Sequence, residues 1–338
     1  MPVKRNEPIA TWLDGDSVEG FVLLSRKERR QDRNGNHFLD LDLTDASGSI
    51  SAKVWSDSPA LEGDYEAHDF VALRGQVKDY RGRLQVSVNR CRTATEADRE
   101  HGFDEALLVP TTHEDIGDLY NRLERLLEQQ VQHPAMRRLG LETLATHGRA
   151  LREHPAAKSI HHACRGGLLE HTVSMAELAI RVAEHYPELD RDLLLLGVLF
   201  HDLGKLLELG AMPANDYTLP GRLVGHIVMG RDLLRERCAA IEDFPDTLRL
   251  HLEHLVLSHH GELEFGSPVR PMTPEALALS FIDNLDSKLA QLREVGRGGG
   301  GMQYLRSFGR FVLLPETADE TGAEDEAEDG TGQAQLEL

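Results

Sequence analysis

The sequence predicts a small β-barrel at the N-terminus followed by an all-helical region, and two patterns carry this prediction. Within residues 17–92, apolar and polar residues alternate in short stretches, which is the period of half-buried strands. From about residue 113, apolar residues recur every three or four positions, which is the period of an amphipathic helix. A chain of 338 residues is long enough for two domains with hydrophobic cores of their own.

The predicted strands of the barrel follow one another closely, and turn-forming residues separate them. The clearest alternating stretches are 37–43, 49–55, 70–77 and 83–88. Gly, Asn and Asp supply turn signals at 34–36, 45–48 and 80–82. A short helix is expected within 58–68, after the third strand. Five short strands with such a helix are typical of an OB-fold barrel, although an SH3-like barrel has a compatible strand count.

The helical part begins after a connector and ends before an acidic tail. We expect a barrel domain at 1–95, a connector and helical linker at 96–155, a helical domain at 156–315 and a disordered tail at 316–338. The segment 304–315 is expected to return as a small strand or turn. The tail holds nine acidic residues and no basic ones, so it accounts for much of the net charge of −20. That charge alone therefore does not argue against a nucleic-acid partner.

Membrane and secretory classes do not fit the sequence. The longest apolar run, 193–200, has eight residues and is too short to span a bilayer. No apolar stretch of the signal-peptide type follows the first basic residues. The three cysteines, Cys91, Cys164 and Cys238, are far apart and odd in number, which argues against a disulfide framework. We expect a cytoplasmic protein without membrane association.

Histidine is concentrated in the helical region, since ten of the 17 histidines lie within 160–290. Together with aspartates they occur in the order His171, His201-Asp202, His226, His259-His260 and Asp283. Imidazole and carboxylate ligands suit divalent transition metals. The apolar run 193–200 leads directly into His201 and Asp202, so this pair is expected at the end of a buried helix. Metal coordination there would offset the cost of burying a charge; hydrogen-bonded core histidines are the alternative for any single residue.

This order of residues resembles the HD superfamily of metal-dependent phosphohydrolases, and His226 with His259-His260 resembles its two-metal members. Longer stretches resemble the YhaM-type 3′→5′ exoribonucleases, which join an N-terminal OB fold to an HD domain. These stretches are HHACRGGLLEHT (161–172), LFHDLGK (199–205), GRLVGHIVMG (221–230), LSHHGELEFGSPVRPMTPEA (257–276) and FIDNLDSK (281–288). No GYP-like signature follows His259-His260, which argues against a cyclic-dinucleotide phosphodiesterase.

The resemblance implies one metal held by His171, His201, Asp202 and Asp283, with Asp202 bridging to a second metal. The second metal would be held by Asp202 together with His226, His259 and His260. His201, Asp202 and Lys205 are the expected catalytic residues. Lys205 lies three positions after Asp202, so on a helix it would share a face with it and either orient that carboxylate or contact the scissile phosphate.

Further residues are candidates for substrate binding or for support of the metal ligands. Asp286 would either orient a ligand histidine or lie at the surface. His161, His162, Arg165 and Arg270 are expected near the substrate entrance. On the barrel, the candidates are Lys78, Arg81, Arg83, Phe38, Trp55 and Tyr80, because OB folds bind single strands with basic grooves and aromatic platforms. A second basic cluster, which is Arg26, Lys27, Arg29, Arg30 and Arg33, is expected at a hairpin tip.

We therefore expect a hydrolase that acts on phosphodiesters. The resemblance implies 3′→5′ exonucleolytic cleavage of single-stranded RNA, with single-stranded DNA as an additional substrate. The expected cofactor is one or two divalent metal ions, with Mn²⁺ first and Co²⁺, Fe²⁺ or Zn²⁺ as alternatives. A nucleotidase or phosphodiesterase acting on small nucleotides and a non-catalytic single-strand-binding protein are the competing functions. The sequence leaves the oligomeric state open.

Overall fold

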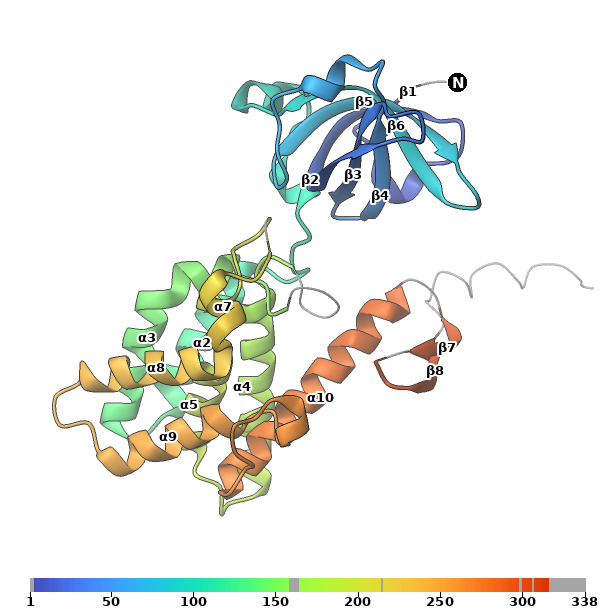
Figure 1. Ribbon diagram of the computed structural model, residues 1–338. Coiled ribbons are helices and arrows are strands. Elements are labelled where there is room, and N and C mark those ends of the chain that lie inside the picture. Colours follow the sequence, from blue (N-terminus) through green and yellow to red (C-terminus); the bar gives the residue numbers. More distant parts are fainter. Residues whose placement is uncertain (1–2, 158–163, 214, 298–299, 306, 316–338) are drawn as a thin grey trace, which may run out of the picture. The chain divides into compact units, whose positions relative to one another are not determined.

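The computed structural model of the chain describes residues 3–157, 164–213, 215–297, 300–305 and 307–315 (Figure 1). The expected acidic tail at 316–338 lies outside the described residues, as do His161 and His162. The chain forms two compact units, one ending at Asp286 and one beginning at Ser287.

Five strands close into a barrel near the N-terminus (Figure 1). They are β2 (Ser17–Gln31), β3 (His37–Asp45), β4 (Gly48–Val54), β5 (Phe70–Asp79) and β6 (Leu84–Thr93). They pair in the order β2-β3-β4-β6-β5, and β5 pairs back onto β2, so this sheet closes on itself. The β4–β6 pair is parallel, while a short strand β1 (Val3–Arg5) adds to β2 at the edge. The OB-fold prediction is confirmed, and the SH3-like alternative is wrong.

Strand β2 is long because it serves both halves of the barrel. Its first half, from Ser17 to Leu23, pairs with β5, and its second half pairs with β3. Between these halves the register shifts, with Ser25 as the extra residue between Leu24 and Arg26. A β-bulge of this kind bends a strand and increases its twist. The bend allows one continuous strand to turn the corner of the barrel.

The barrel core follows from the alternation of the strands. The side chains of Leu39, Leu41 and Leu43 in β3 are buried, as alternate residues of a half-buried strand should be. The helix expected within 58–68 is a 3-10 turn, η2 (Pro59–Glu62). After it, the fully buried Tyr65 donates a hydrogen bond from its hydroxyl to the carbonyl of Ala60 at 2.7 Å, which satisfies its only polar atom.

Helices make up most of the rest of the chain. After the short elements η1 (Ile9–Thr11), η3 (Glu96–His101) and α1 (Glu105–Leu108) come α2 (Ile116–Gln130), α3 (Pro134–Glu153), α4 (Gly167–His185), α5 (Arg191–His201), α6 (Lys205–Glu208), α7 (Leu219–Val224), α8 (His226–Ala239), α9 (Asp246–Ser258), η4 (Leu263–Phe265) and α10 (Pro274–Arg297). The helical region predicted from residue 113 is confirmed. The connector also contains short helical turns, which had no periodic signal.

Helix α5 is the centre of the helical core. All ten of its residues from Asp192 to His201 are buried, including the apolar run that the sequence singled out. Its contacts with α9 are close at Gly197, where a Cβ atom would lie 2.3 Å from the Cδ2 atom of Leu255. At its N-terminus, the Asp190 side chain accepts hydrogen bonds from the backbone amides of Asp192 and Leu193 and so caps the helix.

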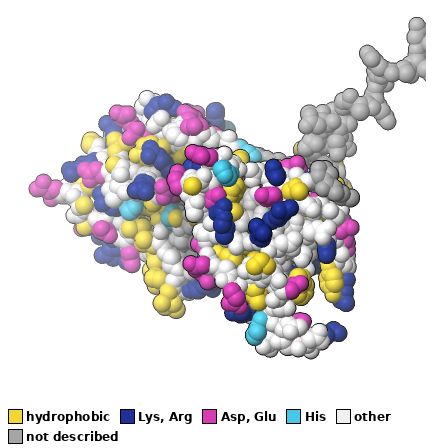
Figure 2. All heavy atoms as spheres, turned by 90° about the horizontal axis from the view of Figure 1, so that it is seen from above, with side chains coloured by type: hydrophobic (Ala, Val, Ile, Leu, Met, Phe, Trp, Pro, Cys, Tyr) yellow, Lys and Arg dark blue, Asp and Glu magenta, His cyan; other side chains and the backbone are white. Residues whose placement is uncertain are grey.

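The second unit contains a hairpin of β7 (Gly301–Leu305) and β8 (Arg310–Leu314). Strand β8 lies within the range predicted to form a small strand, while β7 begins earlier than expected. No helix among the described residues is long and apolar enough to cross a membrane. On the face of the molecule that Figure 2 shows, basic and acidic side chains are interspersed.

We predict that Gly197→Ala lowers the stability of the helical core, whereas Gly296→Ala does not. The new methyl group in α5 would displace Leu255, and overpacking of this kind costs about 1–3 kcal/mol. At Gly296 in α10 no atom lies within 4 Å of the added Cβ, and alanine favours the helix. Thermal unfolding followed by circular dichroism would compare the two variants; equal melting temperatures would contradict the close α5–α9 contact.

Candidate metal centre

Five of the seven predicted metal ligands lie at the ends of helices, and the fold brings all seven together. His171 lies in α4 and Asp283 in α10, while His201 is the last residue of α5 and Asp202 follows it. His226 is the first residue of α8, and His259 and His260 follow α9. Helices far apart in the sequence thus contribute side chains to one site.

The ligand atoms form two groups. His171, His201 and Asp283 place one ligand atom each within 4.8 Å of one another, and so do His226, His259 and His260. Within the first group, Nε2 of His171 is 3.3 Å from Oδ1 of Asp283. Each group has the residue types and the spacing that could hold one divalent cation.

Asp202 lies between the two groups, and each of its oxygens faces one of them. Its Oδ2 atom is 3.3 Å from Nε2 of His201 and 3.9 Å from Nε2 of His171. Its Oδ1 atom is 3.6 Å from Nε2 of His226 and 3.8 Å from Nε2 of His259. A carboxylate in this position could bridge two cations, one on each oxygen.

All five histidines are held by their Nδ1 atoms, so that Nε2 faces the centre. His201 and His259 each bond to the carbonyl three residues earlier, Val198 and Val256, at 2.7 Å. The other three Nδ1 atoms bond to Asp286 (from His171, 2.7 Å), Glu208 (from His226, 3.1 Å) and the Phe265 carbonyl (from His260, 2.9 Å). A ring that donates from Nδ1 to oxygen has its lone pair on Nε2, the form that binds a metal.

The buried polar atoms at the centre fit a cation. Among the described residues, no hydrogen-bond partner is found for Nε2 of His201, His226 and His259 or for Oδ1 of Asp202, although all four atoms are buried. An unsatisfied buried polar atom costs about 1–3 kcal/mol. Because these atoms converge on the same two positions, coordination of divalent cations would satisfy them together.

The electrostatics of the site keep Asp202 ionised. Burial would raise the pKa of its carboxyl, but Lys205 and His201 outweigh burial and hold the pKa well below the usual range. Nζ of Lys205 donates to Oδ2 of Asp202 at 2.7 Å. Burial also opposes the charge on Lys205, yet the attraction of Asp202 is stronger and raises the pKa of Lys205. The pair is thus a partly buried ion pair beside the two ligand groups.

The pKa values of two histidines at the centre are shifted in opposite directions. Burial, together with His201 and His260, lowers the pKa of His259 well below its ordinary value, so this ring is neutral and available as a ligand. Burial also acts on His171, but its hydrogen bonds to Asp283 and Asp286 outweigh it and raise the pKa of His171 to about 9. Two carboxylates therefore compensate positive charge at this ring, whether a proton or a metal supplies it.

Glycines bring α8 against the turn that follows Asp202. A Cβ atom on Gly204 would lie 2.0 Å from the carbonyl oxygen of His226, so only glycine allows this approach. Gly225 has a φ of 80°, in the left-handed region that favours glycine, immediately before His226. The motif containing His201 and Asp202 can therefore lie beside the start of α8.

Two carboxylates outside the predicted ligand set orient ligand histidines. Asp286 is buried and accepts hydrogen bonds from His171 and, at 2.5 Å, from the hydroxyl of Ser174, so the first of its two expected roles is the observed one. Glu208 was not predicted. Its Oε1 atom accepts from both the backbone amide and Nδ1 of His226. A lone glutamate in a four-residue helix carries no periodic signal that could have revealed this role.

The expected helical spacing of Lys205 is wrong, although its contact with Asp202 exists. Helix α5 ends at His201 and α6 begins at Lys205, with a turn between them. In that turn the Lys205 amide bonds to the Asp202 carbonyl at 2.9 Å, which brings the two side chains together.

The structure describes two of the four residues expected at the substrate entrance, Arg165 and Arg270. His161 and His162 lie outside the described residues. Arg165 pairs through its backbone with Thr111 in a parallel bridge. Nε of Arg270 donates to Glu262 at 2.8 Å, so its charge is already compensated at an exposed position.

On the barrel, the predicted aromatic residues lie at the surface and two of them stack. The rings of Phe38 and Trp55 are 5.3 Å apart, and Trp55 is 42% exposed. Nζ of Lys53 lies 5.1 Å from the Phe38 ring. Tyr80 is 62% exposed in the β5–β6 turn, beside the guanidinium of Arg81. Lys78 and Arg83 flank the same turn and are exposed.

The second basic cluster was placed wrongly. Of its members, only Arg33 lies at the hairpin tip, because β2 runs on to Gln31. The other four are in ion pairs, which are Arg26 with Asp42, Lys27 with Glu66, Arg29 with Glu62, and Arg30 with Glu28 and Asp40. None of the alternating stretches singled out in the sequence lies in β2, because its basic residues interrupt the apolar pattern.

Comparisons with known families agree with both parts of the fold. Residues 168–288 match the family model of the HD domain, and this range contains all seven predicted ligands. The chain carries an HD domain. This match indicates a metal-dependent phosphohydrolase. Residues 17–94 match the model of an OB-fold nucleic acid binding domain and contain all five strands of the barrel.

Several solved structures are similar to 28% of the chain. One is a replication protein A heterotrimer bound to single-stranded DNA, with 16% identity, 75% of that chain covered and a TM-score of 0.21. Another is the second OB-fold domain of replication protein A from Methanococcus maripaludis, with 18% identity, 97% covered and a TM-score of 0.22. A third is an OB domain from Thermoplasma acidophilum, with 13% identity, 87% covered and a TM-score of 0.20.

We predict that Glu208→Gln and Asp286→Asn each weaken Mn²⁺ binding by about 10–100-fold, because each removes the carboxylate that orients a ligand histidine. Isothermal titration of the metal-free protein with Mn²⁺ would measure the affinity. Glu262→Gln is the matched control, since this exposed carboxylate contacts Arg270 and no ligand. Unchanged affinity in both variants would contradict the assigned orienting roles.

Proposed function

We propose that this protein is a metal-dependent 3′→5′ exoribonuclease that hydrolyses phosphodiester bonds of single-stranded RNA and also accepts single-stranded DNA. The observation that carries the hydrolytic part of the proposal is the position of Asp202, with one oxygen toward each of two groups of ligand atoms. The direction of cleavage and the preference for RNA rest on the resemblance of the motifs around the ligands to YhaM-type enzymes.

In this proposal, His171, His201, Asp202 and Asp283 hold one cation, and Asp202, His226, His259 and His260 hold a second. Mn²⁺ is the proposed ion, since sites of imidazole and carboxylate accept it. Two divalent cations supply a hydroxide nucleophile near neutral pH and neutralise charge on the phosphoryl oxygens. The chain therefore needs no serine or cysteine nucleophile.

The protein's own residues prepare the site for an anionic substrate. Lys205 keeps Asp202 anionic through the ion pair, and its side chain is 18% exposed, so its ammonium can also face a phosphoryl oxygen. The hydrogen bonds at the Nδ1 atoms fix the five rings in advance, which avoids the cost of ordering them when substrate binds. Burial of His201 and His259 excludes water from the interior side of the site.

The barrel is proposed to guide the single strand. The stacked pair of half-buried Phe38 and exposed Trp55 has the aromatic character of a base-stacking platform, and Lys53 beside it is paired with Asp40. Tyr80 and Arg81 supply a second aromatic–cation pair in the β5–β6 turn. An enzyme acting only on free nucleotides would not need these surfaces, which favours a polynucleotide substrate over the nucleotidase alternative.

We expect Asp202→Asn to lower the rate of RNA hydrolysis at least about 100-fold, since the amide cannot serve two cations as a carboxylate does. The assay incubates the full chain and Mn²⁺ with single-stranded RNA labelled at its 5′ end. Products that shorten progressively from the 3′ end support the proposal; release of a labelled mononucleotide at the outset would contradict the direction. Asp232→Asn, an exposed carboxylate in α8, is the control.

We further expect Trp55→Ala to raise KM for a long oligonucleotide by roughly tenfold, because loss of one stacked base costs about 1–3 kcal/mol. Hydrolysis of a dinucleotide, which has no bases beyond the two at the cleaved bond, should be unchanged. The same variant distinguishes an exoribonuclease guided by the barrel from a nucleotidase. If long and short substrates are affected equally, the barrel does not guide the strand, and a nucleotidase becomes the better description.

A further inference from the structure

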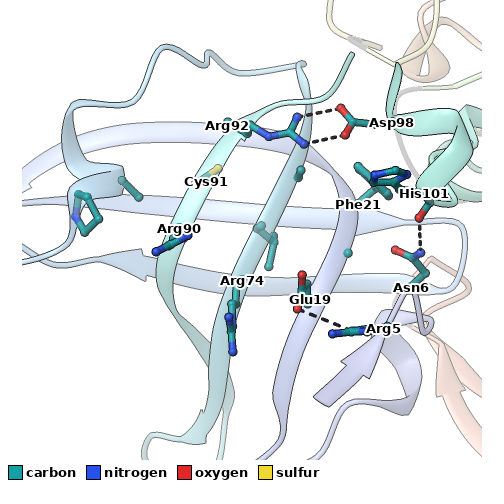
Figure 3. Close-up of a pocket in the computed structure, with 15 residues that line it drawn as sticks. Arg5, Asn6, Glu19, Phe21, Arg74, Arg90, Cys91, Arg92, Asp98 and His101 are labelled. Atoms are coloured by element: carbon teal, nitrogen blue, oxygen red, sulfur yellow. Dashed lines mark hydrogen bonds and ion pairs between the residues drawn. The ribbon is translucent and has the colours of Figure 1, made fainter. Parts of the chain in front are cut away.

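A second polar surface lies on the barrel, away from the Phe38–Trp55 platform. A groove of about 880 Å³ opens over β1, β2, β5 and β6, whereas the platform belongs to β3 and the end of β4 (Figure 3). Its lining includes four arginines, which are Arg5, Arg74, Arg90 and Arg92, but only two carboxylates, Glu19 and Asp98. The groove is thus locally basic in a chain whose net charge is −20.

Four charged residues form one row across the strands at the groove. The register pairs Arg5 of β1 with Glu19 of β2, Glu19 with Arg74 of β5, and Arg74 with Arg90 of β6. Directly paired residues place their side chains on the same face of a sheet, with Cβ atoms about 4.5–5.5 Å apart. Three positive charges and one negative charge are therefore neighbours in this row.

A β-bulge puts Arg90 in this row. Val86 and Val88 are buried, so simple alternation along β6 would turn residue 90 toward the core. The register instead shifts between Arg74 and Gly75, where Val88 and Arg90 face consecutive residues and Asn89 is the extra residue. Cys91 takes the inward position opposite Leu73, and Arg90 becomes exposed beside Arg74. Bulges that redirect a side chain are frequent at functional sites.

Two of the four arginines have carboxylate partners and two do not. Arg5 lies 3.8 Å from Glu19, and Arg92 donates two hydrogen bonds to Asp98 at 2.8 and 2.6 Å (Figure 3). No carboxylate among the described residues lies within ion-pair distance of Arg74 or Arg90. Like charges directly opposite each other destabilise a sheet. A pair of this kind lowers the stability of the sheet, and an anionic ligand bound by both guanidiniums would offset that cost.

We propose that Arg74 and Arg90 bind backbone phosphates of single-stranded nucleic acid, in a site separate from the aromatic platform. This rests on the proposed function in one respect, which is that the polyanion is a nucleic-acid strand. Arginine presents a planar fork of donors that fits phosphate oxygens two at a time. Because the two side chains are cross-strand neighbours, both forks reach one phosphate or two consecutive ones, and the bound anion removes their mutual repulsion.

The test measures binding of a 5′-fluorescein single-stranded oligonucleotide by anisotropy, in EDTA so that no hydrolysis occurs, over a series of NaCl concentrations. The variant is Arg74→Gln with Arg90→Gln in the full chain. It should bind more weakly, and its slope of log affinity against log salt should be smaller in magnitude by about 1 for each arginine removed. Sequence preference should stay the same, because phosphate contacts do not read bases.

Arg138→Gln with Arg149→Gln is the matched control, because it removes the same charge from exposed positions of α3. If the groove variant has the same affinity and salt slope as this control, the proposal is overturned. Titration with inorganic phosphate separates the two sources of the anion. Saturable phosphate binding that the groove variant loses, with oligonucleotide binding unchanged, would assign the site to a small phosphate and overturn the nucleic-acid proposal.

Stability measurements keep these outcomes interpretable. Removal of a repulsive pair should not lower the melting temperature, so the groove variant is expected to be at least as stable as the parent. If the double variant fails to fold, the single variant Arg90→Gln is used in the same titrations. The binding assay contains no metal and no cleavage step. If the groove variant loses salt dependence but the parent protein does not hydrolyse RNA, the groove proposal is supported and the proposed enzyme activity is contradicted. If the parent hydrolyses RNA but the groove variant keeps its salt dependence, the enzyme activity is supported and the groove proposal is contradicted.

Discussion

The HD centre depends on one buried carboxylate. Asp202 is 3% exposed, and it is placed where α5 ends, so that its two oxygens point toward two sets of imidazole nitrogens. Lys205 pairs with this buried charge and stabilises it, and cations could satisfy its remaining lone pairs. The apolar helix that leads into it, the glycine turn that follows it and the start of α8 all serve to hold this one group in position.

The same design recurs at the histidines, where the chain itself fixes each ring. His201 and His259 use one local device, a hydrogen bond to the carbonyl three residues back at the end of a helix. His171 and His226 use carboxylates from other helices. The hydrogen bond to a carbonyl three residues earlier needs only a histidine at the end of its own helix. The hydrogen bonds of His171 and His226 to carboxylates require those other helices to be packed in place, so the geometry of the metal centre depends on the core formed around α5.

The ligand set could be predicted from the sequence because its order and its surrounding stretches are specific, and the barrel because strand alternation is a local property. What escaped prediction depends on chain geometry that no local pattern records. Glu208 is a single carboxylate in a short helix, and Lys205 reaches Asp202 through a turn instead of along a helix. The basic residues of β2 looked like a loop because charge hid the strand period, and the bulge at Asn89 reverses the facing that alternation assigns to Arg90.

The anchoring of the five rings has a consequence for how the protein gains and loses its ions. In small zinc domains the metal organises the chain, so removal of the ion unfolds it. Here the imidazoles are oriented by hydrogen bonds within the protein, and the helices carrying them pack on the hydrophobic core around α5. The orientation of the rings therefore does not depend on a bound ion. A protein built in this way should keep its fold when its ions are removed, so that a different cation could be loaded without refolding the chain.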